Sequence, residues 1–131
     1  MITFDDFKAS GGTPIYLQIL NFVKRGIVAG TIADGDELPS RRVLSARLGI
    51  NPNTVQKAFK ALEDEGLILS RSGAKSYVNV TPRVIKRLKE ELLMDDVKNI
   101  AEALKQMGIT KDEAVSLIGK YWDDPEEGGE K

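Results

Sequence analysis

The sequence predicts a mainly α-helical protein with one small β-hairpin, arranged as a winged helix-turn-helix domain followed by a short α-helical domain. Two short helical segments, residues 40–48 and 52–65, are separated by a tight turn at Gly49. Residues 67–80 contain two short runs with β preference, and the chain from Thr81 onward carries apolar residues at three- and four-residue spacing. We expect a winged helix-turn-helix domain over residues 1–80, a helical dimerisation domain over 81–122 and a disordered acidic tail over 123–131.

The first helix follows a polar N-terminal stretch. Residues 1–12 contain a Gly-Gly break and are expected to form a loosely held arm. Thr13 can cap a helix whose first residue is Pro14, where the missing N–H costs nothing, and Gly30 can end it. The apolar residues of this helix, which is about 16 residues long, are Tyr16, Ile19, Leu20, Val23 and Ile27. Residues 32–37 then form a connecting turn.

The second and third helices have clear start signals. Ser40 is a good N-cap for the second helix and Asn51 for the third, which has Pro52 at its first position. The second helix is expected to bury Val43, Leu44 and Leu48, and the third Val55, Ala58, Phe59 and Leu62. The opposite face of the third helix carries Asn53, Thr54, Gln56, Lys57 and Lys60.

The β-hairpin is predicted from residues 67–70 and 76–80, with the turn at 71–75. A long helical stretch then runs from Thr81 to Met107, and its apolar stripe changes register near residues 95–96, so we expect a kink or a break there. Residues 110–113 match a capping box that starts a last amphipathic helix. The apolar residues expected to join two subunits are Leu92, Val97, Ile100, Leu104 and Trp122.

This pattern indicates a surface for double-stranded DNA. The third helix would enter the major groove by its N-terminal end, where Asn and Gln can bond adenine, Lys favours guanine, and Thr can touch a thymine methyl group or a phosphate. The start of the second helix would clamp a phosphate, and the glycine at the hairpin tip would let the backbone approach DNA between two basic residues. The candidate DNA-binding residues are Ser40, Arg41, Arg42, Asn53, Thr54, Gln56, Lys57, Lys60, Arg71, Gly73 and Lys75.

The charge of the chain is unevenly distributed, although its net value is only −1. Residues 40–80 contain seven basic and three acidic residues, a balance of +4, whereas residues 81–131 contain nine basic and twelve acidic residues, a balance of −3. Screening at physiological salt confines such interactions to roughly 8 Å. A locally basic face can therefore meet phosphates even though the chain as a whole is slightly acidic.

The composition also argues against other classes of protein. The chain has no Cys and no His, which excludes disulfides, thiolate nucleophiles and His-ligated zinc, and no cofactor motif, phosphate loop or nucleophile–base set is visible. We therefore expect no enzyme and no cofactor. No apolar stretch of about 18 residues predicts a membrane span, and the acidic N-terminus is unlike a signal peptide, so a cytoplasmic location is expected.

Several motifs follow one another along the chain: Leu38-Pro39-Ser40-x-Arg42-x-Leu44, then Leu48-Gly49-Ile50-Asn51-Pro52-Asn53-Thr54-Val55, Ala58, Leu62-Glu63-x-Glu65-Gly66-Leu67-Ile68 and Gly73. Together they resemble the GntR family of bacterial transcription regulators. The opening Thr13-Pro14-Ile15-Tyr16-Leu17-Gln18-Ile19 is similar to the first helix of that family, so the resemblance spans roughly residues 13–80. The helical tail, with its run from Gly108 to Ala114, is similar to the small YtrA-like branch.

The resemblance implies a homodimer joined by C-terminal helices, a repressor of a palindromic operator, and no inherited ligand pocket; whether any small-molecule effector exists is left open. It also implies that Arg42 holds a phosphate or a guanine, that Asn53, Thr54 and Gln56 face bases or phosphates, and that Gly73 forms the wing tip. The chain departs from the family pattern at Pro52, where many relatives have Arg. A proline cannot make the base contact expected of that arginine. The contacts with DNA are therefore expected to depend more on Arg41, Gln56 and Lys57.

Structural interpretations stand beside these functional ones. The two N-caps can be caps alone, Lys60 can be simply solvated, and the two arginines of the second helix can form salt bridges with Glu37 or Glu63. The hairpin can be a plain one, and the C-terminal apolar residues can pack within one chain. The carboxylates of residues 90–96 could hold a divalent metal ion, although capping and solvation explain them as well. The alternative function is a winged-helix module that binds protein without binding an operator.

Overall fold

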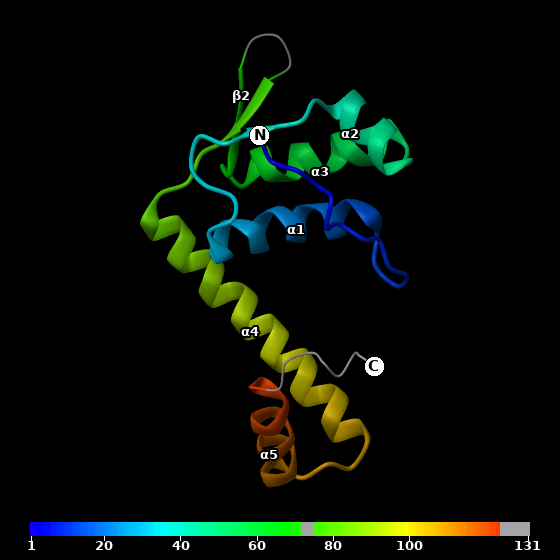
Figure 1. The fold of residues 1–131 in the computed structure, drawn as a ribbon, viewed down its shortest axis with the longest axis vertical. Coiled ribbons are helices and arrows are strands. Elements are labelled where there is room, and N and C mark those ends of the chain that lie inside the picture. Colours follow the sequence, from blue (N-terminus) through cyan, green and yellow to red (C-terminus); the bar gives the residue numbers. More distant parts are fainter. Residues whose placement is uncertain (72–74, 124–131) are drawn as a thin grey trace. The chain divides into compact units, whose positions relative to one another are not determined.

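The computed structural model describes residues 1–71 and 75–123, which form five helices and a three-stranded sheet (Figure 1). The chain divides into two compact units, Met1–Glu91 and Leu92–Lys131. The acidic tail was predicted over residues 123–131, and all of it except Asp123 lies outside the described residues. None of the described helices is both long enough and apolar enough to span a membrane.

Helix α1, Ile15–Ala29, begins one residue later than the sequence predicts. Pro14 is the N-cap, with an extended backbone (φ −54°, ψ 139°), and its carbonyl accepts the N–H groups of Leu17 and Gln18. The expected cap by Thr13 is therefore wrong. The predicted end is confirmed, because Gly30 adopts a left-handed conformation at φ 87°, which glycine reaches without steric cost.

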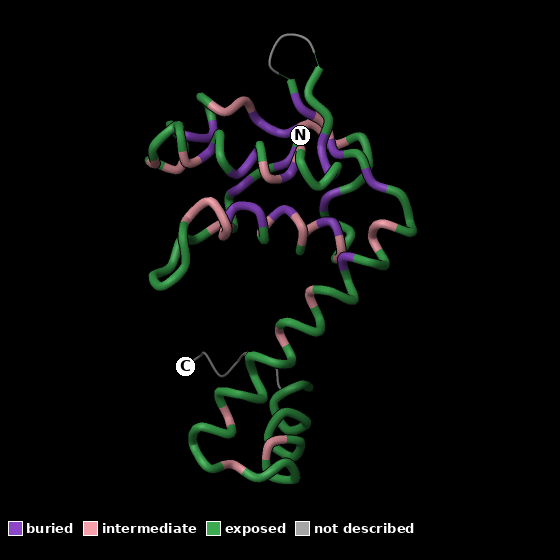
Figure 2. The backbone as a smooth tube through the Cα atoms, turned by 180° about the vertical axis from the view of Figure 1, so that it is seen from behind, coloured by how far each residue is buried: buried purple, intermediate pink, exposed green. Residues whose placement is uncertain are grey.

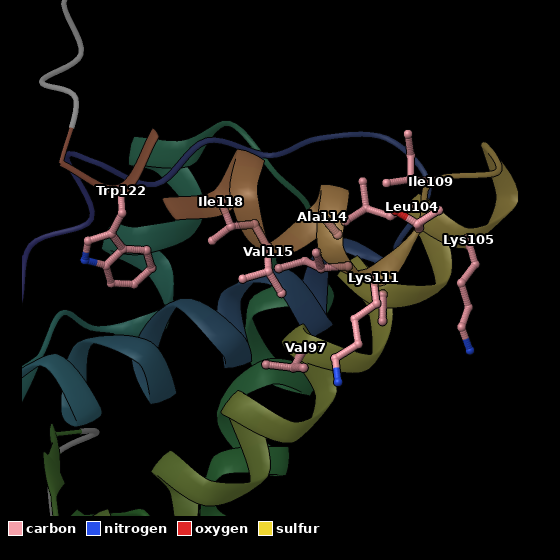
Figure 3. Close-up of a pocket in the computed structure, with 12 residues that line it drawn as sticks. Val97, Leu104, Lys105, Ile109, Lys111, Ala114, Val115, Ile118 and Trp122 are labelled. Carbon is pink, nitrogen blue, oxygen red and sulfur yellow. The ribbon is translucent and has the colours of Figure 1, made fainter. Parts of the chain in front are cut away.

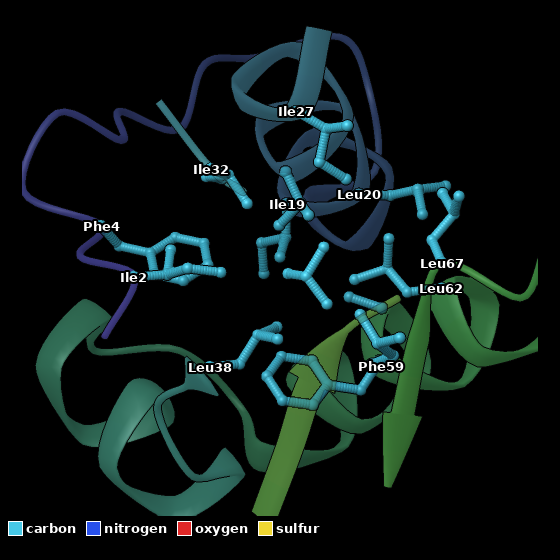
Figure 4. Packing of buried hydrophobic residues seen from close by; sticks show 14 of the residues in the cluster. Ile2, Phe4, Ile19, Leu20, Ile27, Ile32, Leu38, Phe59, Leu62 and Leu67 are labelled. Atoms are coloured by element: carbon cyan, nitrogen blue, oxygen red, sulfur yellow. The ribbon is translucent and has the colours of Figure 1, made fainter. Parts of the chain in front are cut away.

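The N-terminal segment is packed on the first unit, so the expectation of a loosely held arm is wrong. The N–H of Ile2 donates to the carbonyl of Glu37 at 2.8 Å, and Phe4 is only 3% exposed. The Phe4 ring stacks on Phe22 with 5.0 Å between centroids. Figure 4 shows Ile2 and Phe4 pointing into the cluster of buried side chains beside Leu38. The arm is held because its apolar residues find a place in the core.

Helices α2, Arg41–Leu48, and α3, Pro52–Asp64, form the helix-turn-helix, and their predicted caps are confirmed. Ser40 Oγ accepts the N–H of Val43 at 3.1 Å, and Asn51 Oδ1 accepts the N–H of Asn53 at 2.7 Å. One predicted core position is wrong, since Val43 is 45% exposed. Ser45 occupies the inner face instead, where its hydroxyl donates to the carbonyl of Ile50 at 2.8 Å.

The wing is a three-stranded antiparallel sheet rather than an isolated hairpin. Strand β1, Glu37–Leu38, falls in the segment predicted to be a turn and pairs with β3, Lys75–Val78, which also pairs with β2, Ile68–Arg71. Arg71 and Lys75 were expected in the turn but face each other across the ladder as the last described pair. A two-residue strand carries no periodic signal, so only its partner reveals it.

The core of the first unit lies between α1, α3 and the sheet (Figures 2 and 4). The inner stripe predicted for α3 is confirmed, since Val55, Ala58, Phe59 and Leu62 are all at most 1% exposed. Burying such side chains contributes roughly 25 cal/mol for each Å² of apolar surface removed from water. This packing holds α3 with one face inward and the opposite face at the surface.

Helices α4, Pro82–Gln106, and α5, Lys111–Trp122, make up the C-terminal part of the described chain. Of the kink or break expected near residues 95–96, the break is wrong, because α4 is one uninterrupted helix. The predicted cap of α5 is confirmed, as Thr110 Oγ1 accepts the N–H of Glu113 at 3.1 Å. In the second unit the described residues are exposed or only partly buried (Figure 2), so this helical pair has almost no core of its own.

Candidate DNA-binding surface

The outward face of α3 is polar and accessible from its first turn. Asn53, Gln56 and Lys57 are exposed, and Thr54 is half-buried. They stay at the surface because the residues between them, such as Val55, are buried against α1 and the sheet. Amide groups and an ammonium group at the start of a helix can make hydrogen bonds to base edges in a major groove.

Lys57 is held at the surface by an aromatic ring from α1. Its ammonium nitrogen lies 4.3 Å from the centroid of the Tyr16 ring, within the range of a cation–π interaction. The sequence predicts Lys57 as a site residue but treats Tyr16 only as part of the apolar stripe of its helix. The pairing joins two helices distant in sequence, so helical periodicity could not have revealed it.

Lys60 lies one turn further along α3 and is paired. Its ammonium nitrogen is 2.8 Å from Asp64 Oδ1, and both side chains are more than half exposed. The hydrogen bond to Asp64, with the charge of that carboxylate, raises the pKa of Lys60 above its ordinary value. The ammonium group is therefore charged at neutral pH, although a phosphate would compete with Asp64 for it.

The start of α2 brings three predicted residues together, in different surroundings. Ser40 is half-buried and caps the helix, and Arg42 is exposed. Arg41 turns inward: its guanidinium carbon is 4.9 Å from the centroid of the Phe59 ring, and Nη2 is 3.9 Å from Glu63 Oε2. The salt bridge to Glu63, one of the two alternatives that the sequence allows, is thus present at long range.

The two basic residues of the wing are both exposed, as predicted. Arg71 lies with its guanidinium carbon 5.5 Å from the centroid of the Tyr77 ring, and Lys75 is its cross-strand partner. Gly73, the predicted wing tip, lies outside the described residues. The described ends of β2 and β3 therefore carry two positive charges side by side.

A second surface lies on the C-terminal helices and is apolar. A groove of about 520 Å³ runs along α4 and α5 (Figure 3), and its lining includes four of the five predicted dimerisation residues: Val97, Ile100, Leu104 and Trp122. Trp122 is 81% exposed and Val97 60%, whereas Leu104 and the fifth residue, Leu92, are half-buried. Large apolar side chains exposed together on a soluble protein mark an interaction surface.

The acidic residues of α4 do not gather into one cluster. Within residues 1–71 and 75–123, no three carboxylates gather closely enough to hold a metal ion. Glu91 instead lies 3.9 Å from Arg87 one turn earlier. The exposed polar and basic residues described above are contributed by α2, α3 and the wing.

Comparison with known proteins finds the same architecture. Residues 15–78 match the family model described as bacterial regulatory proteins, gntR family. The chain is 39% identical over 95 residues to the HTH-type transcriptional repressor YtrA of Bacillus subtilis, covering 72% of this chain and 68% of that protein. It is 28% identical over 116 residues to the uncharacterized HTH-type transcriptional regulator YhcF of the same organism, covering 88% and 96%. Among solved structures, a GntR family transcriptional regulator from Listeria monocytogenes superposes with a TM-score of 0.74 at 30% identity, covering 86% of this chain and 98% of that one.

Proposed function

Since the chain belongs to the GntR family of DNA-binding transcriptional regulators, and to its YtrA-like branch, we propose that it represses transcription as a homodimer bound to a palindromic operator. One observation carries the proposal: α3 buries one face in the core and leaves Asn53, Gln56 and Lys57 exposed on the other. Because its buried face is anchored in the core, α3 can insert its exposed face into a major groove while the rest of the domain stays folded. Because its target is chromosomal DNA, we also propose a cytoplasmic location.

The start of α3 reads bases. Gln56 and Asn53 each offer a donor and an acceptor that fit the edge of adenine, and Lys57 fits the acceptors of guanine. Thr54 is half-buried beside them and suits a thymine methyl group or a phosphate. The ring of Tyr16 restricts the Lys57 ammonium group, which lowers the entropy lost when that group binds.

Phosphate contacts come from three places around α3. Ser40 and Arg42 stand at the start of α2, where backbone N–H groups and the helix dipole favour an anion. A phosphate bound at this end would also offset the repulsion between the positive end of the helix dipole and the exposed Arg42. Lys60 serves from the side of α3, and Arg71 and Lys75 serve from the wing.

The dimer forms through the C-terminal helices. The exposed apolar residues of the second unit cannot be covered by its own two helices, and a second copy offers a face of the same chemistry. Two recognition helices related by a two-fold axis would then meet half-sites about 34 Å apart. A repressing role is suggested by YtrA, which is named as a repressor.

The test is operator binding by variants of α3. Gln56→Ala should weaken binding to the best site by about 1–3 kcal/mol and relax the preference at one base pair. Lys60→Ala should weaken binding to all sequences alike, because a phosphate contact carries no base information. Fluorescence anisotropy on a panel of single-base operator variants measures both effects.

If Gln56→Ala and Lys60→Ala lowered the affinity for every DNA sequence by the same factor, α3 would not be the element that recognises bases. Absence of any sequence preference in the wild-type protein would favour a module that binds protein instead. The panel can be designed from an inverted repeat upstream of the coding region of this protein.

A further inference from the structure

The side chain of Arg41 is placed differently from those of the other basic residues near α3. It has only 25% of its surface exposed, and its guanidinium group lies over the Phe59 ring. Its Nε atom is buried and has no hydrogen-bond partner among the described residues. A guanidinium that is mostly shielded from solvent is stabilised by a nearby carboxylate, and Glu63 lies at 3.9 Å.

Glu63 also holds the wing. The same oxygen that faces Arg41, Oε2, accepts a hydrogen bond from Ser70 Oγ on β2. Ser70 Oγ in turn lies 3.3 Å from the hydroxyl of Ser76, which is buried on β3. The contacts therefore run from the first turn of α2, through the last turn of α3, to strands β2 and β3 of the wing.

This connection matters at the basic end of the wing. Ile68 and Val78 are buried in the core and fix the base of the sheet, whereas Leu69 and Arg71 on β2 are exposed. A hydrogen bond to a charged carboxylate is about twice as strong as a neutral one. One carboxylate at the end of α3 can thus set the angle at which the basic end of the wing stands beside the recognition helix.

We propose that Glu63 and Arg41 are positioning residues: Glu63 joins the wing to the helix-turn-helix, and Arg41 supports that carboxylate instead of binding a phosphate. The inference rests on the proposed operator binding and assigns Arg41 a role different from that of its exposed neighbour Arg42. Its consequence is that removing the Arg41 side chain lowers affinity by misplacing the wing, while the phosphate contacts made by other residues remain.

Salt dependence separates the two roles of the arginines. Each phosphate contact adds about 0.9 to the slope of log affinity against log salt concentration on B-DNA. Arg42→Met should reduce that slope by about 0.9. Arg41→Met keeps an apolar side chain over Phe59 and should leave the slope unchanged while weakening operator binding by about 2- to 5-fold, the size expected when one ion pair is lost. A slope for Arg41→Met that falls as far as that of Arg42→Met would overturn the proposal.

The link itself is measured in the free protein. Glu63→Ala should speed amide hydrogen exchange in β2 and β3 by about tenfold, because the wing opens more often. Asp64→Ala is the matched control: it removes the adjacent carboxylate, which pairs with Lys60 and makes no hydrogen bond or ion pair to the wing among the described residues. Equal exchange in the two variants would overturn the proposal. A wild-type protein without operator preference would contradict the proposed function, and the exchange rates would still decide whether Glu63 holds the wing.

Discussion

At the scale of single residues, the basic side chains predicted to bind DNA fall into distinct environments. Arg42 and Lys75 are exposed, Lys57 and Arg71 lie over tyrosine rings, and Lys60 is paired with Asp64. The sequence treats all of them as equivalent positive charges. The free energy needed to bring each of these side chains to a phosphate depends on its present partner, because a residue that already has a partner must exchange it.

Asp64→Asn should strengthen binding to DNA of any sequence. The substitution removes a negative charge from the side of α3 and frees Lys60 for a phosphate, so affinity should rise by about 2- to 5-fold at low salt, the size expected for an exposed charge pair. Anisotropy titrations with operator and with random DNA measure the change. Glu102→Gln removes a carboxylate from the second unit and serves as the control; a similar gain in both variants would show a general effect of net charge.

The interaction of Lys60 with DNA also has a defined pH dependence. The pKa of Lys60 is raised above 10.5, chiefly by the hydrogen bond to Asp64, so its charge is fully present below the unfolded pKa and disappears only as pH rises through the higher folded value. The ratio of DNA affinities of wild type and Lys60→Ala should therefore stay constant between about pH 6 and about pH 9. Anisotropy across that range measures it, and a ratio that changes near neutral pH would contradict a permanently charged Lys60.

At the scale of elements, local signals and packing each decided part of the result. The caps of α2, α3 and α5 depend on one side chain and a backbone N–H close in sequence, so the sequence predicts them. Strand β1 and the packed N-terminal segment depend on β3 and on the core, which lie far away in sequence. The break expected in α4 is wrong because a shift in the apolar stripe changes only which face of the helix is apolar. It does not interrupt the backbone hydrogen bonds.

Phe4→Ala should destabilise the first unit, although residue 4 belongs to a segment that looks like a loose arm. Removal of a buried phenyl ring typically costs about 3–5 kcal/mol, and this ring contacts Phe7 and Phe22. Urea denaturation measures the free energy of unfolding. Asp5→Ala, at the neighbouring exposed position, should change it by less than about 0.5 kcal/mol. Equal stability of the two variants would mean that the N-terminal segment is not part of the core.

At the scale of the whole molecule, the two units differ in the chemical character of their surfaces. The first has a packed core and a basic face, whereas the second exposes large apolar side chains along α4 and α5. The proposed homodimer would give this unit the apolar burial that its described residues lack in a single chain. The division of surfaces supports a division of labour in which one unit binds DNA and the other joins subunits.

Val97→Glu should disrupt the proposed homodimer. Val97 is 60% exposed, so a charge there does little to its own chain but would be buried without a partner in the interface. Sedimentation velocity should show monomers, and operator affinity should fall because the two half-sites are no longer bound by linked subunits. Leu104→Glu should act in the same way, although it is half-buried. Asn99→Glu, exposed two residues further along α4, is the control; a dimer that survives Val97→Glu would exclude this face.

The sequence by itself determined the helix-turn-helix, the inner stripe of α3 and the polar face opposite it, because helical periodicity and capping are local and are written in consecutive residues. It also identified the GntR family through motifs in fixed order. Only the tertiary structure decided that Ile2 and Phe4 belong to the core, that β1 completes the sheet, that Lys57 meets Tyr16 and that Arg41 turns toward Glu63. These contacts join residues distant along the chain, and a side chain with several possible partners takes the one that the packed fold brings within reach.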